Sequence, residues 1–221
     1  VHRFPGNRDA PLQLLKSDTF GTVSRDGDRV IRDTRTAQPW ARPLARYLKR
    51  REQRALSHLA ACDIDGIPQL LASDHDSLAR TWIDGSPLHL ARPHDVDYFR
   101  AALRLLRRLH AAGVIHNDLA KETNWLVTPD GRPALVDFQL ASVLRRRGAC
   151  ARSRGHDDLR HLLKHKRTCL PERLTARERR ILATPSLLSR AWMATGKKVY
   201  LFVTRRLLHW RDREGAGDRT R

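Results

Sequence analysis

Three observations predict an α+β fold in two parts, with a sheet-rich N-terminal part and a mainly helical C-terminal part. Strand-like runs joined by turn residues lie near the N-terminus, around the Asp26-Gly27-Asp28 turn signal. Helical periodicity dominates from residue 96 onward, and between residues 113 and 138 short apolar strands alternate with polar loops. We expect one part over 1–83, a second over 84–211, and a disordered basic tail over 212–221.

A single helix is expected within residues 41–60 of the N-terminal part. Apolar residues recur there at spacings of three and four, the period of one helix face: Leu44, Leu48, Leu56 and Leu59. Glu52 lies on the same stripe. A carboxylate on a buried face needs a cation, because burying it unpaired is costly. Arg51 and His58 on the helix itself are the local candidates for this pairing.

An extended segment, residues 79–88, which Gly85 and Pro87 interrupt, connects the two parts. A helix over 96–110 follows, with an apolar stripe that we expect to be buried: Val96, Phe99, Leu103, Leu106 and Leu109. Further helical patterns lie at 157–167, 175–189 and 197–211. The last is basic on one side and apolar on the other, which is typical either of a membrane-surface helix or of a final packed helix.

Two carboxylates and a carboxamide stand on loops between residues 109 and 138. Phosphoryl transfer from Mg-ATP needs an acidic residue that orients the acceptor hydroxyl and accepts its proton. It also needs an Asn and a second Asp to hold the metal that bridges the phosphates. Asp118, Asn124 and Asp137 match the base and the two metal ligands, in that order along the chain.

The motif His116-Asn117-Asp118-Leu119, followed by Asn124 and by Asp137-Phe138, resembles the protein-kinase-like superfamily. The resemblance implies a minimal two-lobed kinase fold, with an antiparallel sheet and one helix in the small lobe and a helical large lobe. It also implies ATP and Mg²⁺ as cofactors. Five residues separate Asp118 from Asn124 where the family pattern has four, so the loop must bulge to bring Asn124 to the metal.

The same resemblance assigns residues that bind the nucleotide. Arg32 stands where the family carries a strand Lys for the phosphates, and Glu52 corresponds to the helical glutamate that pairs with that cation. The alternative for Arg32 is a surface position on an edge strand. Gly21 and Val23 match the last part of the family's Gly-rich loop.

Three further contacts follow from the resemblance. The carbonyl of Thr81 and the amide of Ile83 are expected to meet the adenine, and Lys121 is a candidate contact to the γ-phosphate. Downstream of Asp137-Phe138, Gln139 replaces the glycine that usually follows.

The acceptor side resembles the bacterial lipopolysaccharide (Kdo) kinases, which also carry Arg at the strand position, and the RIO-like atypical kinases. No A-P-E motif follows Asp137, and Asn117 replaces the Arg that receives a regulatory phosphate, so no phosphorylation switch is expected. A basic segment, read either as an anion-receiving surface or as solvated arginines, follows the metal turn: Arg145, Arg146, Arg147, Arg152 and Arg154.

Three functions are therefore open. The first is a kinase for an anionic acceptor, such as a lipopolysaccharide inner-core sugar or another phosphorylated glycan. The second is a RIO-like serine/threonine kinase with a protein substrate. The third is a nucleotide-binding pseudokinase scaffold, which the incomplete Gly-rich loop and the longer catalytic loop favour.

Composition bears on partners and location. The chain has 221 residues and a formal net charge of +19, which favours anionic partners or an anionic membrane surface, with nucleic acid as the less favoured alternative. Three scattered cysteines predict neither a disulfide framework nor a zinc site. No apolar run approaches the roughly 18 to 20 residues that span a bilayer. We expect a cytoplasmic monomer with peripheral contact at the inner face of the cytoplasmic membrane.

Overall fold

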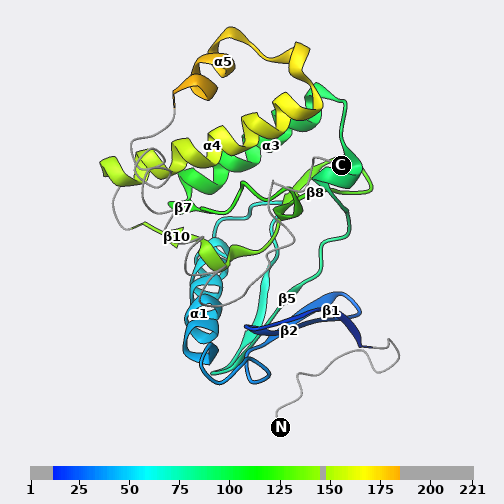
Figure 1. The fold of residues 1–221 in the computed structure, drawn as a ribbon, viewed down its shortest axis with the longest axis vertical. Coiled ribbons are helices and arrows are strands. Elements are labelled where there is room, and N and C mark those ends of the chain that lie inside the picture. The colour runs from blue at the N-terminus through cyan, green and yellow to red at the C-terminus, as the bar shows by residue number, and fades with distance from the viewer. Residues whose placement is uncertain (1–11, 145–147, 185–221) are drawn as a thin grey trace, which may run out of the picture.

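The computed structural model describes residues 12–144 and 148–184 and has the α+β architecture that the sequence predicts. An antiparallel sheet with one helix forms the N-terminal part, and helices dominate the C-terminal part (Figure 1). Within the described ranges, no helix combines the length and apolarity that a membrane span requires. Three predicted features lie outside them, namely the arginines at 145–147, the helix at 197–211 and the tail at 212–221.

The N-terminal sheet is a five-stranded antiparallel sheet in the order β1-β2-β3-β5-β4. Its strands are β1 (Gln13–Asp18), β2 (Gly21–Asp26), β3 (Arg29–Asp33), β4 (Leu70–Ser73) and β5 (Ser77–Thr81). The register places Val23 of β2 opposite Arg32 of β3. On the other side of β3, Val30 pairs with Arg80 of β5. Because alternate residues of a strand share a face, Arg32 and Arg80 project from the same side of the sheet.

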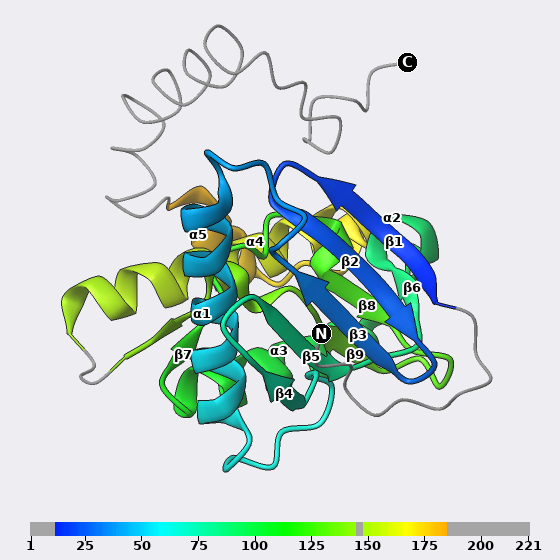
Figure 2. The same cartoon turned by 90° about the horizontal axis from the view of Figure 1, so that it is seen from below.

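Helix α1 (Arg42–Leu59) packs beside β4 and β5 on one side of the sheet (Figure 2). Glu52, Leu56 and Leu59 of the predicted stripe are buried, but Leu44 is 48% exposed, and Ala45 is buried instead. Ala45 and Ala55 on this face allow the helix to approach its neighbours closely. The helix therefore buries a mixed face of small, apolar and charged residues rather than a row of leucines.

A buried cation also connects α1 to the sheet. Lys49 is 1% exposed, and its Nζ donates to Ser73 Oγ at 3.0 Å and to the carbonyl of Asp74. Burial lowers the pKa of Lys49, and the charge of Asp74 opposes that effect. These bonds hold the middle of α1 against the β4–β5 turn, because a buried ammonium requires such acceptors.

The C-terminal part is organised around α3 (Val96–Ala111) and α4 (Ala149–Cys169), which pack side by side (Figure 1). Asp95 caps α3 by accepting a hydrogen bond from the amide of Asp97. The remaining elements are β6 (Ser86–Pro87), α2 (Leu88–Ala91), β7 (Val114–Ile115), η1 (Glu122–Asn124), β8 (Trp125–Val127), β9 (Pro133–Leu135), η2 (Phe138–Leu140), β10 (Ser142–Val143), η3 (Pro171–Arg173) and α5 (Ala176–Ala183).

Short strands hold the two polar loops in place. Strand β7 pairs with β10, and β8 lies between β6 and β9. Beneath the loops, Leu119, Trp125 and Phe138 are fully buried and belong to the main hydrophobic core. The loops that carry Asp118 and Asp137 therefore rest on a packed and rigid base.

One glycine of the sheet is required by close backbone contact. Gly21 has φ of +115°, and a Cβ at this position would lie 2.2 Å from the carbonyl oxygen of Asp33. Gly27, in the β2–β3 turn, has φ of +56° and open space around the Cβ position.

We predict that Gly21→Ala lowers the free energy of unfolding by at least about 3 kcal/mol. The new Cβ forces the backbone of the two strands apart, and alanine is also strained at this φ. The matched control Gly27→Ala should cost only about 1 kcal/mol, the cost of the left-handed conformation alone. Urea denaturation of both variants measures the difference. Equal losses would contradict the account of Gly21.

Candidate active site

Asp118 lies in the loop between β7 and η1, with its side chain 15% exposed. Lys121 Nζ lies 3.1 Å from Asp118 Oδ2. Burial raises the pKa of Asp118 and the charge of Asp137 adds to this, whereas Lys121 and Asn124 act in the opposite direction. A carboxylate with a raised pKa accepts a proton more readily, which suits a group that takes the proton of an acceptor hydroxyl.

The extra residue of the loop is accommodated by one turn of 3₁₀ helix, η1, which ends at Asn124. The side-chain amide of Asn124 donates to the backbone oxygen of Asp118 at 2.8 Å and to its Oδ2 at 3.0 Å. The structure therefore brings Asn124 to Asp118 despite the longer spacing. Because the amide nitrogen is directed at Asp118, the amide oxygen is the atom that can face a cation.

Asp158 of α4 anchors the loop from below. Its carboxylate is 1% exposed and accepts hydrogen bonds from the backbone amides of His116, at 2.9 Å, and Asn117, at 3.0 Å. The His116 ring nitrogen Nε2 is 3.0 Å from the carbonyl of Val136, which joins this loop to the one that carries Asp137. The approach to Asp118 is thus fixed by buried hydrogen bonds.

Asp137 directly precedes η2 in a left-handed conformation, with φ of +63°. Gln139 Nε2 donates to its Oδ1 at 2.7 Å, and Arg32 Nη2 lies 3.7 Å from the same atom. Burial acts to raise the pKa of Asp137. The charge of Arg32, the hydrogen bond from Gln139 and the charges of Arg80 and Lys121 outweigh burial, so the pKa lies below its ordinary value. The carboxylate stays ionised, as a metal ligand must.

Glu52 joins two arginines at the centre of the N-terminal part. It is fully buried, with Arg32 Nε 3.1 Å from its Oε2 and Arg80 Nε 3.1 Å from its Oε1. The structure thus contains the Arg32–Glu52 pair and excludes the local alternatives as its main partners. Burial acts to lower the pKa of Arg32, but the charges of Glu52 and Asp137 outweigh burial, so the pKa lies above its ordinary value. The cluster extends from α1 through the sheet to Asp137.

The residues fit a magnesium ion that binds together with a nucleotide. Among the described residues, no group of three or more His, Cys, Asp and Glu side chains could hold a metal ion by itself. Mg²⁺ is usually bound by one or two carboxylates, with phosphates and water completing its shell. The carboxylate of Asp137 and the amide oxygen of Asn124 match that requirement, and the charge of Arg32 lies beside Asp137.

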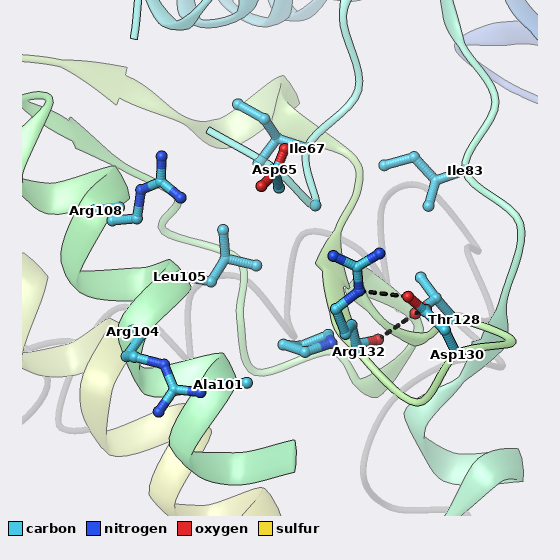
Figure 3. Close-up of a pocket in the computed structure, with 12 residues that line it drawn as sticks. Asp65, Ile67, Ile83, Ala101, Arg104, Leu105, Arg108, Thr128, Asp130 and Arg132 are labelled. Atoms are coloured by element: carbon cyan, nitrogen blue, oxygen red, sulfur yellow. Dashed lines mark hydrogen bonds and ion pairs between the residues drawn. The ribbon is translucent and has the colours of Figure 1, made fainter. Parts of the chain in front are cut away.

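The predicted adenine contacts lie on the connection between the two parts. Thr81 ends β5 and is held there, since its amide donates to Gln69 O at 2.9 Å and its hydroxyl accepts from Gln69 N at 2.9 Å. The side chain of Ile83 lines a cavity of about 520 Å³ shared with α3 and the β8–β9 turn (Figure 3). None of the candidate phosphate or metal ligands lines this cavity, so it is distinct from the site around Asp118.

Sequence reasoning missed Arg80 and Asp158. Arg80 lies in a run predicted as the connection between the two parts, where side-chain identity was expected to matter little. The available signal was its place on a strand beside Arg32, which predicts a shared face once the pairing is known. The available signal for Asp158 was a carboxylate on the apolar side of a predicted helix.

Comparisons with known proteins give weak similarity to protein kinases. No protein-family model matches the chain. A stretch of 82 residues is 37% identical to serine/threonine-protein kinase WNG1 of Toxoplasma gondii and covers 36% of this chain and 13% of that protein. A stretch of 149 residues is 32% identical to mitogen-activated protein kinase mpkC of Aspergillus niger and covers 62% of this chain and 37% of that protein.

The chain therefore spans only about an eighth and about a third of the lengths of these two relatives. The similarity suggests the protein-kinase-like superfamily, in agreement with the two-part α+β fold. Both relatives are named as protein kinases. The two relatives do not indicate whether the chain is nearer to the lipopolysaccharide kinases or to the RIO-like kinases.

We predict that the Glu52 cluster responds to substitution in an uneven way. Glu52→Gln should lower the free energy of unfolding by about 3 kcal/mol or more, because it leaves two buried guanidinium groups without their carboxylate. Arg32→Met or Arg80→Met alone should cost less, since the other arginine still pairs with Glu52.

The double variant Arg32→Met with Arg80→Met should therefore cost more than the sum of its two single variants. Chemical denaturation of the four variants measures these differences. Strictly additive losses would show that the two arginines do not share Glu52.

Proposed function

We propose that this chain transfers the γ-phosphoryl group of ATP to a hydroxyl of an anionic acceptor, such as an inner-core sugar of lipopolysaccharide. The observation that carries the proposal is the meeting of Asp118 and Asn124 on one loop, opposite an Asp137 that Arg32 and Glu52 hold in place. This combination supplies a base, two ligands for a cation and a fixed positive charge.

The residues divide the work of the reaction. Bound Mg-ATP supplies the phosphoryl group and ADP as the leaving group. Asp118 orients the acceptor hydroxyl and accepts its proton as the new oxygen–phosphorus bond forms. Lys121, paired with Asp118 at 3.1 Å, is close enough to contact the transferred group. Arg32 stabilises phosphate charge, so catalysis rests on positioning and electrostatics.

The segment after the metal turn supports a compact acceptor. Only residues 138–148 separate Asp137 from the start of α4, which leaves little surface to grip an extended peptide. Arg51 Nη2 donates to the carbonyls of Leu140, at 2.6 Å, and Ala141, at 3.0 Å. Asn117 Nδ2 donates to Leu140 O at 2.8 Å. The part of the segment that these bonds reach is therefore held without a phosphorylated residue, which favours constitutive activity.

The charge and the strand arginine support an anionic acceptor at the inner face of the cytoplasmic membrane. A net charge of +19 attracts such acceptors and an anionic surface alike. A serine/threonine protein kinase is the second candidate, favoured by the names of both relatives. Under this second candidate, the chain would belong to the RIO-like group. Under the main proposal, we expect the chain to be a monomer.

The test is a radiolabel transfer assay from γ-labelled ATP with lipopolysaccharide, bulk protein and RNA–protein particles as separate acceptors. Label on lipopolysaccharide that is lost in Asp118→Asn supports the proposal. Label on protein alone would move the function to a protein kinase. ATP binding without transfer to any acceptor would favour a pseudokinase scaffold.

We predict that Asp118→Asn lowers turnover at least about 100-fold and leaves the affinity for ATP within a few-fold, because the base touches the acceptor rather than the nucleotide. Steady-state kinetics and calorimetry of the same preparation give the two values. Equal losses in both would remove the assignment of Asp118 as base.

Asp137→Asn should behave in the opposite way and weaken the binding of Mg-ATP itself, because it removes a charged ligand from the metal. The affinity for ATP without Mg²⁺ should change much less. Calorimetry with and without Mg²⁺ measures the contrast. Unchanged Mg-ATP affinity in this variant would refute the metal role.

A further inference from the structure

Three large apolar side chains are exposed together at α1. Trp40, in the turn that leads into the helix, is 64% exposed, and Leu44 and Tyr47 on the helix are 48% and 54% exposed. Single exposed apolar residues are common on protein surfaces, but a group of them on one face indicates a contact surface. The sheet does not cover them, because α1 packs against it through its buried side (Figure 2).

The exposed apolar residues share one side of the helix with basic residues. Positions 40, 44, 47, 51 and 54 are spaced alternately by four and three residues, so they follow one helix face. Trp40 precedes α1, but the amide of Arg42 donates to the carbonyl of Gln38 at 3.0 Å, which is the hydrogen-bond spacing of an α-helix. The face is therefore apolar over its first half and basic over its second half, where Arg51 and Arg54 follow.

No carboxylate of α1 offsets the charge of this side. The only acidic residue of the helix is Glu52, which is fully buried and pairs with Arg32 and Arg80. Arg50 and Arg54 are exposed, and none of the ion pairs among the described residues includes either of them. An exposed surface that carries arginines without carboxylates attracts anionic partners.

This combination of side chains fits a lipid surface with anionic head groups. Tryptophan and tyrosine are favoured at the level of the head groups, because each has an apolar ring and one polar atom. An arginine can lay its apolar stem along the acyl boundary while its guanidinium group meets a lipid phosphate. Helices that lie on membranes carry apolar residues on the contact side and Lys or Arg beside them.

We propose that the outer side of α1 binds the surface of an anionic lipid bilayer. This α1 face consists of Trp40, Leu44, Tyr47, Arg50 and Arg54. The three apolar side chains enter the head-group region, and the two arginines contact lipid phosphates. Lipid binding concerns this surface alone, so it stands whether or not the chain transfers phosphate.

The α1 face also lies beside the segment that follows Asp137. Helix η2 directly follows Asp137 and packs against α1, and Arg51 Nη2 donates to the carbonyl of Leu140 at 2.6 Å. Leu140 is itself 37% exposed. A chain bound through the α1 face therefore holds this segment close to the lipid head groups, where a membrane-anchored acceptor is found. This last point rests on the proposed function, whereas lipid binding does not.

The test is co-sedimentation of the whole chain with two kinds of vesicle. One kind contains phosphatidylcholine alone, and the other contains phosphatidylcholine and phosphatidylglycerol in equal parts. The unaltered chain should bind the anionic vesicles at least about tenfold more tightly than the neutral ones. Added salt should reduce this preference, because charge is screened over about 8 to 10 Å at ordinary ionic strength.

The double variant Trp40→Ser with Leu44→Ser should bind the anionic vesicles at least about tenfold more weakly, because it removes most of the apolar surface that enters the head groups. Its matched control is Leu71→Ser with Leu90→Ser, two similarly exposed residues on β4 and α2. The control should stay within about twofold of the unaltered chain, because it leaves the α1 face unchanged.

A second pair of variants tests the arginines. Arg50→Gln with Arg54→Gln should lose most of the preference for anionic vesicles. Arg177→Gln with Arg180→Gln, exposed on α5 away from this face, removes the same charge and should keep that preference. Equal losses in these two variants would show diffuse attraction between a basic chain and the vesicles, and would overturn the proposal.

Two other results would overturn it as well. The unaltered chain could stay in the supernatant with both kinds of vesicle. Alternatively, analytical ultracentrifugation without lipid could show a dimer that Trp40→Ser with Leu44→Ser abolishes, which would assign the α1 face to a second copy of the chain. Neither result depends on phosphoryl transfer, so failure of this proposal and failure of the proposed function are distinguishable.

Discussion

The buried carboxylate of Glu52 is the constraint on which the arrangement of the N-terminal part depends. A fully buried carboxylate cannot remain ionised without partners, and Glu52 has two, Arg32 and Arg80, each at 3.1 Å. These pairs fix α1 against the sheet at one height and one rotation. Through Arg32, they also reach Asp137 in the C-terminal part, so the two parts of the chain meet across one charged cluster.

A second buried carboxylate plays the same part in the C-terminal half. Asp158 holds two consecutive backbone amides just before Asp118, while Asn124 holds Asp118 from the other side. The result is a pair of loops whose polar ends are preorganised and whose undersides are packed core. Such rigidity favours a role in which the protein positions groups and supplies charge, rather than one that depends on a large rearrangement.

The sequence predicted features that depend on local pattern, and it predicted that a buried carboxylate has a cation as partner. The helix at 42–59, the strands beside the polar loops and the Arg32–Glu52 pair belong to this class. It did not predict Arg80 or Asp158, because each acts on residues far away along the chain, and only the tertiary packing brings them together. The buried face of α1 was predicted only in part, since Glu52, Leu56 and Leu59 are buried as expected, whereas Leu44 is exposed and Ala45 is buried instead.

The most direct test of this account is whether ATP binding depends on magnesium. Titration of the unaltered chain with ATP, first with Mg²⁺ and then with an excess of chelator, compares the two affinities on one preparation. The account predicts at least about tenfold tighter binding with Mg²⁺, because the carboxylate of Asp137 repels bare phosphates and attracts them only through the metal. Equal affinities in the two conditions, or no binding of ATP, would contradict the assignment of this site.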